Sequence, residues 1–144
     1  MKPLNYMIDT NIALDLLLAR TPFDIEAMQI FALAEAGSIK LYLSSDAIST
    51  ISYLVTRNKD TQTARQAIAL LLDYVSLAPL DEEMVYKALA LDFTDIEDSL
   101  VVSVADACKA QAIITRNVKD LKGSPLPVLT PKEFLALRAH KHIV

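Results

Sequence analysis

The chain has 144 residues, and a hydrophobic fraction of 53% with a charged fraction of 22% is typical of a globular domain rather than a disordered segment. Fourteen basic and eighteen acidic residues give a net charge of −4, which argues against a protein that coats nucleic acid with a basic face. With only two glycines and one cysteine, a glycine-rich phosphate loop, a disulfide framework and a multi-cysteine metal site are excluded.

Hydrophobic patterning predicts strands and helices that alternate along the chain. Leu4 to Ile8 is a short apolar run between a proline and an acid, which indicates a buried strand, whereas Ile12, Leu16 and Ala19 follow helical spacing. The predicted strands are residues 4–8, 40–43, 75–78, 112–115 and 128–129. The predicted helices are residues 11–19, 24–36, 45–57, 61–74, 81–91, 95–111 and a last helix that begins near residue 130. Residues 119–127 are expected to be irregular, because a glycine and two prolines lie close together there.

Strands that alternate with helices favour a parallel sheet covered on both faces. We therefore expect an α/β fold, a three-layer α/β/α sandwich whose mostly parallel central sheet has about five strands. The length predicts a single domain over residues 1–144. One reduced cysteine, the lack of a basic and apolar leader, and apolar runs too short for a bilayer predict a cytoplasmic protein without a membrane segment.

Acidic residues gather at one predicted edge of this sheet. In an open parallel sheet, ligands bind beyond the carboxyl ends of the strands. Asp9 directly follows the first predicted strand, and Asn117 and Asp120 follow the fourth. The long helix that leads into the fourth strand starts at the same edge, and its first turn carries Asp95, Glu97 and Asp98. We therefore expect acids from three remote segments to meet there.

Carboxylates brought together in this way repel one another, and one of them should titrate abnormally. A hard divalent cation removes the repulsion. Mg²⁺ and Mn²⁺ prefer oxygen ligands, and Mg²⁺ usually keeps several of its waters. Such an ion lowers the pKa of a bound water and neutralises charge that develops on a phosphate. The sequence therefore predicts a Mg²⁺ or Mn²⁺ site.

Several acids also have a purely structural interpretation. Thr94 and Glu97 fit a capping box with Thr94 as the N-cap residue, and acids in a first turn complement the helix dipole. Asp9 fits the N-cap of the helix that follows it. Asp15 fits a solvated surface acid, and Asp106 fits either a partly buried ion pair or a functional acid.

Four segments resemble the motifs of PIN domains, the fold of VapC-like toxin ribonucleases. They are MIDTNIALD at residues 7–15, DIEDSL at 95–100, IITRNVKDL at 113–121 and LTPKEFL at 129–135. Their order and spacing cover essentially the whole chain. This resemblance implies a metal-dependent ribonuclease that places three or four acids around Mg²⁺ or Mn²⁺.

The resemblance also implies roles for particular residues. Asp9 matches the first acid of the family, and Asp98 matches the acid at the start of the long helix. Asn117 stands where many relatives have a fourth acid, and Asp120 matches a nearby acid that is often present. Asn11 matches a polar residue that commonly assists the first aspartate.

The sequence departs from the family in the helix after the second strand, where relatives usually carry a glutamate. Here the position is Thr50 or Ser49, and a hydroxyl is a poor substitute for a carboxylate ligand. Because Asn117 is neutral as well, the charged metal ligands reduce to Asp9 and Asp98. Two carboxylates with waters still suffice to hold Mg²⁺. The supporting residues are Thr10, Asn11, Thr50, Asp95, Glu97 and Asp120.

The leading hypothesis is a metal-dependent endoribonuclease that hydrolyses RNA phosphodiesters with a metal-activated water. In this hypothesis Asn117, Thr10 or Asn11 positions reacting groups by hydrogen bonds. Arg116 or Lys119 contacts a phosphate, although each also fits an ordinary exposed basic residue.

Two alternatives remain open. Thr50 is equally compatible with a catalytically weakened PIN-fold module that binds RNA or protein. A phosphatase of the haloacid-dehalogenase type also begins with an acid after its first strand, but it needs a second aspartate where this chain has Asn11. The resemblance further implies a small antitoxin partner and a homodimer.

Overall fold

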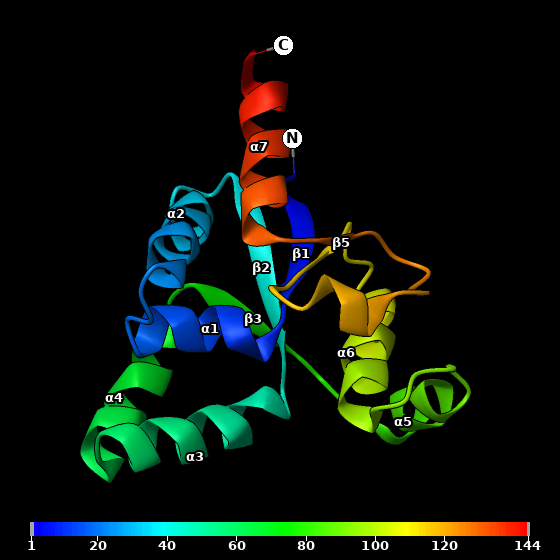
Figure 1. Ribbon diagram of the computed structural model, residues 1–144, viewed down its shortest axis with the longest axis horizontal. Coiled ribbons are helices and arrows are strands. Elements are labelled where there is room, and N and C mark those ends of the chain that lie inside the picture. Colours follow the sequence, from blue (N-terminus) through cyan, green and yellow to red (C-terminus); the bar gives the residue numbers. More distant parts are fainter. Residues whose placement is uncertain (1, 144) are drawn as a thin grey trace.

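The computed structural model of the chain describes residues 2–143, with side chains described as far as residue 140. A parallel sheet of five strands lies at its centre, in the order β3-β2-β1-β4-β5 (Figure 1). The strands are β1 (Leu4–Ile8), β2 (Ile39–Ser44), β3 (Val75–Ala78), β4 (Ile113–Ile114) and β5 (Val128–Leu129). The predicted α/β fold with about five parallel strands is therefore confirmed.

Helices connect the strands and cover both faces of the sheet. They are α1 (Thr10–Leu17), α2 (Phe23–Glu35), α3 (Ala47–Asn58), α4 (Thr61–Leu71), α5 (Glu82–Leu89), α6 (Ile96–Ala107) and α7 (Pro131–Ile143). A short 3₁₀ helix, η1 (Val118–Leu121), follows β4. Two predictions were wrong in detail. Residues 119–127 are not wholly irregular, because η1 reaches into them, and α6 ends well before residue 111, since Lys109 adopts a left-handed backbone with φ 58°.

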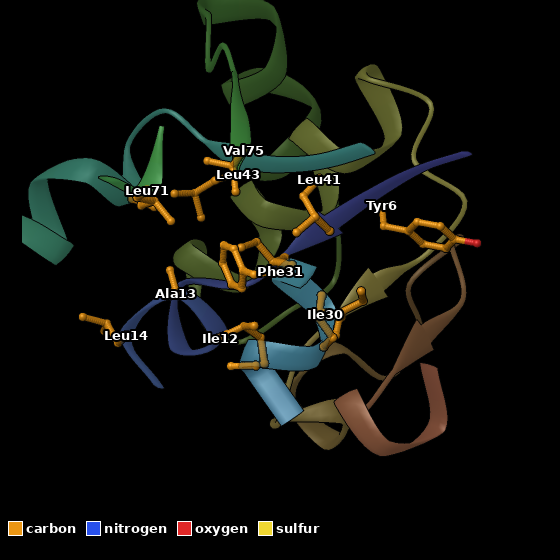
Figure 2. Close-up of a cluster of buried hydrophobic side chains, with 14 of the residues drawn as sticks. Tyr6, Ile12, Ala13, Leu14, Ile30, Phe31, Leu41, Leu43, Leu71 and Val75 are labelled. Atoms are coloured by element: carbon orange, nitrogen blue, oxygen red, sulfur yellow. The ribbon is translucent and has the colours of Figure 1, made fainter. Parts of the chain in front are cut away.

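Alternating side chains of the central strands build two separate hydrophobic cores. Tyr6 and Ile8 of β1 point to the face covered by α1, α2, α3, α4 and α7, whereas Met7 points to the face covered by α5 and α6. Figure 2 shows part of the first core, where Ile12 and Phe31 lie between α1, α2 and the sheet. The edge-to-face contact of the Tyr6 and Phe134 rings, with centroids 4.8 Å apart, joins α7 to this core. The three layers are those of the predicted sandwich.

Strand β4 is very short, and this matters for the site. It pairs with β1 through Met7↔Ile113 and Ile8↔Ile114, so the first residues after the two strands, Asp9 and Thr115, come out side by side. The main chain continues this alignment for one more step, since the Asp9 N–H donates to the Ile114 carbonyl over 2.9 Å. The carboxyl ends of β1, β2 and β4 thus meet at one edge. Within residues 2–143, no helix is both long and apolar enough to span a membrane.

Candidate active site

A cavity of about 290 Å³ lies at the carboxyl edge of the sheet. Its walls come from the segments after β1, β2 and β4 and from the start of α6, which are remote in sequence. Six carboxyl side chains line it, namely Asp9, Asp46, Asp95, Glu97, Asp98 and Asp120. Among the side chains that the structure describes, residues 2–140, no lysine or arginine lines the same cavity. The structure therefore brings the predicted acids together in one place of uncompensated negative charge.

Three hydrogen bonds hold the Asp9 carboxylate at the carboxyl end of β1. Its Oδ1 accepts the Thr10 N–H over 2.8 Å, which makes it the N-cap residue of α1. Its Oδ2 accepts the Thr115 hydroxyl over 2.8 Å and the Asn11 amide over 3.4 Å. Burial raises the pKa of the Asp9 carboxyl, while the hydrogen bonds from Thr115 and Thr10 act in the opposite direction. The capping interpretation of Asp9 is thus correct, and it does not remove the carboxylate from the cavity.

Thr115 is the centre of this network, and sequence reasoning did not single it out. Its side chain is fully buried. Besides donating to Asp9, its Oγ1 accepts the Asn11 side-chain amide over 3.2 Å and the Asn117 backbone N–H over 3.0 Å. The available signal was its position, because a hydroxyl directly after β4 must face the acid directly after β1 in a parallel pair.

Asp98 carries the clearest electrostatic signature of the cavity. Burial, and then the nearby charges of Asp95, Asp120, Asp9 and Glu97, raise the pKa of its carboxyl to about 6. Within residues 2–143, neither a hydrogen bond nor an ion pair of protein origin compensates this side chain. A carboxyl without an internal counter-charge, next to other acids, is a candidate ligand for a cation.

The capping box predicted at the start of α6 was wrong. The helix begins at Ile96, one residue later than a Thr94 cap requires, and Asp95 is its N-cap residue. The Asp95 Oδ1 accepts the Glu97 N–H over 2.9 Å. Glu97 is therefore free of the predicted reciprocal bond, and its side chain lines the cavity. Asp95 combines a capping role with a place on the cavity wall.

Asp46 is an acid of the cavity that sequence reasoning missed. It stands at the N-cap position of α3, but its side chain accepts no hydrogen bond from that helix. Its Oδ1 instead accepts the Ser44 hydroxyl, and it lines the cavity together with Thr50, which lies about one helical turn further along α3. The rule that selected Asp9, an acid just beyond the carboxyl end of a strand, would have selected Asp46 after β2.

The other predicted site residues described here lie in the acidic cavity or in a hollow beside it. Asn117 and Asp120 line the acidic cavity, as do Thr10 and Asn11. Lys119 lies instead in an adjoining hollow of about 400 Å³, which shares Asp95, Asp98 and Asp120 with the cavity.

Arg116 lies outside both hollows. Its Nε and Nη2 donate to the Asp15 carboxylate over 2.6 and 3.1 Å. The interpretation of Asp15 as a solvated acid was therefore wrong, because the residue is completely buried and needs cationic partners. Asp106 is exposed and, within residues 2–143, forms no ion pair, so the predicted partly buried pair was wrong as well.

The donor set fits a hydrated divalent cation better than an enclosed one. Across residues 2–143, no three His, Cys, Asp or Glu side chains already stand close enough to surround an ion. All the charged donors of the cavity are carboxylates, however, and the described side chains up to residue 140 give them no counter-charge within it. Mg²⁺, which commonly uses one or two carboxylates and retains waters, matches this arrangement.

Comparison with known proteins agrees with the fold and with the quoted motifs. The PIN domain family model matches residues 5–119. The chain is 28% identical over 134 residues to Ribonuclease VapC1 of Aquifex aeolicus, and the match covers 88% of this chain and 90% of that protein.

Solved structures with a similar fold were found as well. The toxin-antitoxin complex from Klebsiella pneumoniae is similar with a TM-score of 0.67 and 25% identity, covering 88% of this chain and 97% of the other. VapBC2 from Rickettsia felis, solved with a DNA fragment from its promoter, has a TM-score of 0.67 at 19% identity, covering 88% and 98%. With most of its length matched by the family model, this chain belongs to the PIN domain family.

Proposed function

We propose that the protein is an endoribonuclease that depends on Mg²⁺ or Mn²⁺, with Asp9 and Asp98 as the charged metal ligands. The observation that carries this proposal is a cavity lined by six carboxyl groups and, among the described side chains of residues 2–140, by no basic one. Burial and then the neighbouring acids raise the pKa of Asp98, and a divalent cation would relieve the repulsion among these charges. The name of the Aquifex aeolicus relative, Ribonuclease VapC1, supports RNA as the substrate.

When bound, the metal supplies charge neutralisation at the phosphate and a more acidic water. The side chains of this protein do the rest. Thr10 and Thr115 fix the Asp9 carboxylate, and Asp98 approaches from the first turn of α6. Asn117, which also lines the cavity, offers an amide to the substrate. Holding these groups ready limits the reorganisation that the reaction requires.

Asp46 provides the negative charge on the α3 side of the cavity. Thr50 stands where relatives usually carry a glutamate, and both residues line the same wall. The Ser44 hydroxyl orients the Asp46 carboxylate. In this proposal an acid at the beginning of α3 would supply the negative charge that relatives usually provide from within that helix. The catalytically weakened module, the second candidate, is favoured if Asp46 does not serve in this way.

Lys119 and Lys122 mark the path of the RNA beside the metal. Both are exposed and line the hollow that adjoins the acidic cavity. Neither lies within 4.0 Å of a carboxylate among the described residues 2–143, so their ammonium groups are available to phosphates. A polyanion repelled by the acids is held most readily from this side. Arg116, committed to Asp15, does not take part in this contact.

An antitoxin is the proposed protein partner. A groove of about 540 Å³ runs between α1, α2 and α4, and its lining includes Leu16, Met28 and Leu70. Met28 is 57% and Leu70 50% exposed, so the groove presents apolar surface to solvent. A helix with an apolar face fits such a groove. The Klebsiella pneumoniae relative was solved as a toxin-antitoxin complex, which supports this assignment. A homodimer, a single domain over residues 1–144 and a cytoplasmic location stay predictions.

The decisive experiment is cleavage of a labelled RNA by the purified protein with Mg²⁺, Mn²⁺ or a chelator. We expect Asp9→Asn and Asp98→Asn each to lower the rate by at least about 100-fold, because each removes a charge needed to hold the ion. Asp106→Asn is the matched control, since it neutralises an exposed acid of α6 away from the cavity. Cleavage that survives Asp9→Asn, or that continues in chelator, contradicts the proposal and exposes a contaminating nuclease.

Metal binding without turnover separates the two candidates. If the protein binds Mn²⁺ and RNA but cleaves none of the RNAs tested, the weakened binding module is the better description. Measurable phosphomonoester hydrolysis would revive the haloacid-dehalogenase alternative, against which the PIN domain match already argues.

A further inference from the structure

Asp15 and Arg116 form a buried pair that the acidic cavity does not include. Asp15 lies on α1 with its side chain completely buried. The Arg116 guanidinium grips both carboxylate oxygens, Nε to Oδ2 at 2.6 Å and Nη2 to Oδ1 at 3.1 Å. Its central carbon lies 4.0 Å from the centroid of the Phe23 ring. A two-point grip combined with ring stacking fixes both the position and the plane of a guanidinium.

The segment that carries Arg116 forms its last backbone hydrogen bond to the sheet at Thr115, whose N–H donates to the Leu129 carbonyl over 2.9 Å. Strand β4 contributes only Ile113 and Ile114 to the sheet, and η1 follows almost at once. Arg116 stands between Thr115, which binds Asp9, and Asn117, which lines the cavity. Its own backbone N–H donates weakly to the Asn11 Oδ1, over 3.4 Å. This segment is therefore attached to α1 through side chains rather than through a long ladder of backbone hydrogen bonds.

Arg20 provides an internal comparison. Its Nε lies 3.1 Å from the Asp15 Oδ1, so Asp15 has two arginine partners. Arg20, however, comes from the connection between α1 and α2, close to Asp15 in the chain, and has no link to the segment after β4. Neutralising Asp15 and anchoring the β4–η1 segment are thus separable tasks, and only Arg116 performs the second.

We propose that the Asp15–Arg116 pair is a positioning device that holds the β4–η1 segment in place. Thr115 then keeps its hydrogen bond to the Asp9 carboxylate, and Asn117 keeps its position in the cavity wall. Arg116 acts on the reaction through these neighbours and not by contact with RNA. The inference rests on the proposed ribonuclease function for its kinetic part only. Small displacements of positioned groups have large effects, up to about 100-fold for 1 Å.

The test compares Arg116→Gln with Arg20→Gln, since each removes one of the two positive partners of Asp15. We expect Arg116→Gln to lower kcat about tenfold with little change in the KM for RNA or in its salt dependence, after correction for the folded fraction. Arg20→Gln should stay within about twofold of the natural protein, and Arg116→Lys, which restores the charge without the two-point grip, should recover activity in part. Equal losses in both glutamine variants, or no loss in Arg116→Gln, overturn the proposal. A raised KM with a weaker salt dependence overturns it in favour of a phosphate contact.

Amide NMR spectra provide a readout that does not depend on catalysis. The Asn117 N–H donates to Thr115 and the Thr10 N–H to Asp9, so both resonances report on the network. We expect both to shift in Arg116→Gln and to remain in place in Arg20→Gln. If the natural protein cleaves no RNA, the proposed function fails while this comparison still decides the inference. Unshifted resonances in Arg116→Gln overturn it.

Discussion

The buried acid Asp15 and the acids of the cavity differ in whether arginines lie beside them. Asp15 is completely buried, yet two arginines surround it. Asp9 and Asp98 lie at the carboxyl edge of the sheet, and no basic side chain within residues 2–140 lines their cavity. The fold thus neutralises the acid that serves structure and leaves unneutralised those proposed to bind metal. A carboxylate left without a partner by the protein itself is a better sign of a ligand site than burial alone.

The largest expected effect is the loss of stability on replacing Asp15. Asp15→Ala leaves Arg20 and Arg116 without their shared counter-charge, so we expect the free energy of unfolding to fall by about 3–5 kcal/mol. Urea unfolding measures this loss. A change below about 1 kcal/mol would mean that the arginines find solvent easily, and the contrast with the acidic cavity would lose its basis.

Thr115→Val is the next test, because it removes a buried hydroxyl but preserves shape. The substitution deprives Asp9 of a donor and the Asn117 N–H of an acceptor, so we expect a loss of about 1–3 kcal/mol in stability. The pKa of Asp9 should also rise, since the hydrogen bond from Thr115 lowers it. Urea unfolding and carboxyl ¹³C NMR titration measure the two effects. Thr115→Ser keeps the hydroxyl and should match the natural protein in the titration; an unchanged Asp9 titration in Thr115→Val contradicts the prediction.

The smallest effect concerns Asp98 and pH. Its folded pKa of about 6 lies above the ordinary value, so folding favours the protonated form. The associated stability is fully present below the unfolded pKa near 4 and is lost as pH rises through about 6. We therefore expect Asp98→Asn to raise the melting temperature of the metal-free protein at pH 7.5 by a few °C at most, about 0.5 kcal/mol or less after solvent screening. No difference should appear at pH 3.

Mg²⁺ should make the natural protein more stable than Asp98→Asn at pH 7.5. At a concentration of about ten times Kd it stabilises the natural protein at pH 7.5 by about 1.4 kcal/mol, and this gain should fade as pH drops through about 6. Scanning calorimetry of the natural protein and of Asp98→Asn, each with and without Mg²⁺, measures these stabilities. Equal stabilisation of Asp98→Asn by Mg²⁺ would remove Asp98 from the ligand set.

Most of the fold followed from local patterns in the sequence. The strands at 4–8, 75–78 and 128–129 were predicted at their observed bounds, since a proline or a charged or polar residue marks their ends. The rule that ligands bind beyond the carboxyl ends of parallel strands brought Asp9, Asp98, Asn117 and Asp120 to one cavity, as the structure shows. Their roles in metal binding and catalysis stay predictions.

The errors share a physical cause. Asp15 looked like a surface acid because a helical pattern records only nearby residues, whereas its partner Arg116 is 101 residues away in the chain. Thr94 looked like a cap because one residue of offset in the start of a helix cannot be read from the pattern. Asp46 was overlooked because the search for the family's glutamate was confined to the interior of α3. Long-range pairing and exact helix ends are decided by tertiary contacts.

Asp9 and Asp98 differ in one respect that guides the choice of an inactive protein for structural work with RNA. Asp9 begins α1 and accepts the Thr115 hydroxyl, so replacing it disturbs a helix start and a buried hydroxyl together. Asp98 caps no helix and, among the described residues 2–143, receives no hydrogen bond, so replacing it alters little except charge. Asp98→Asn is therefore the preferable variant for trapping an uncleaved substrate, because its framework should match the native one.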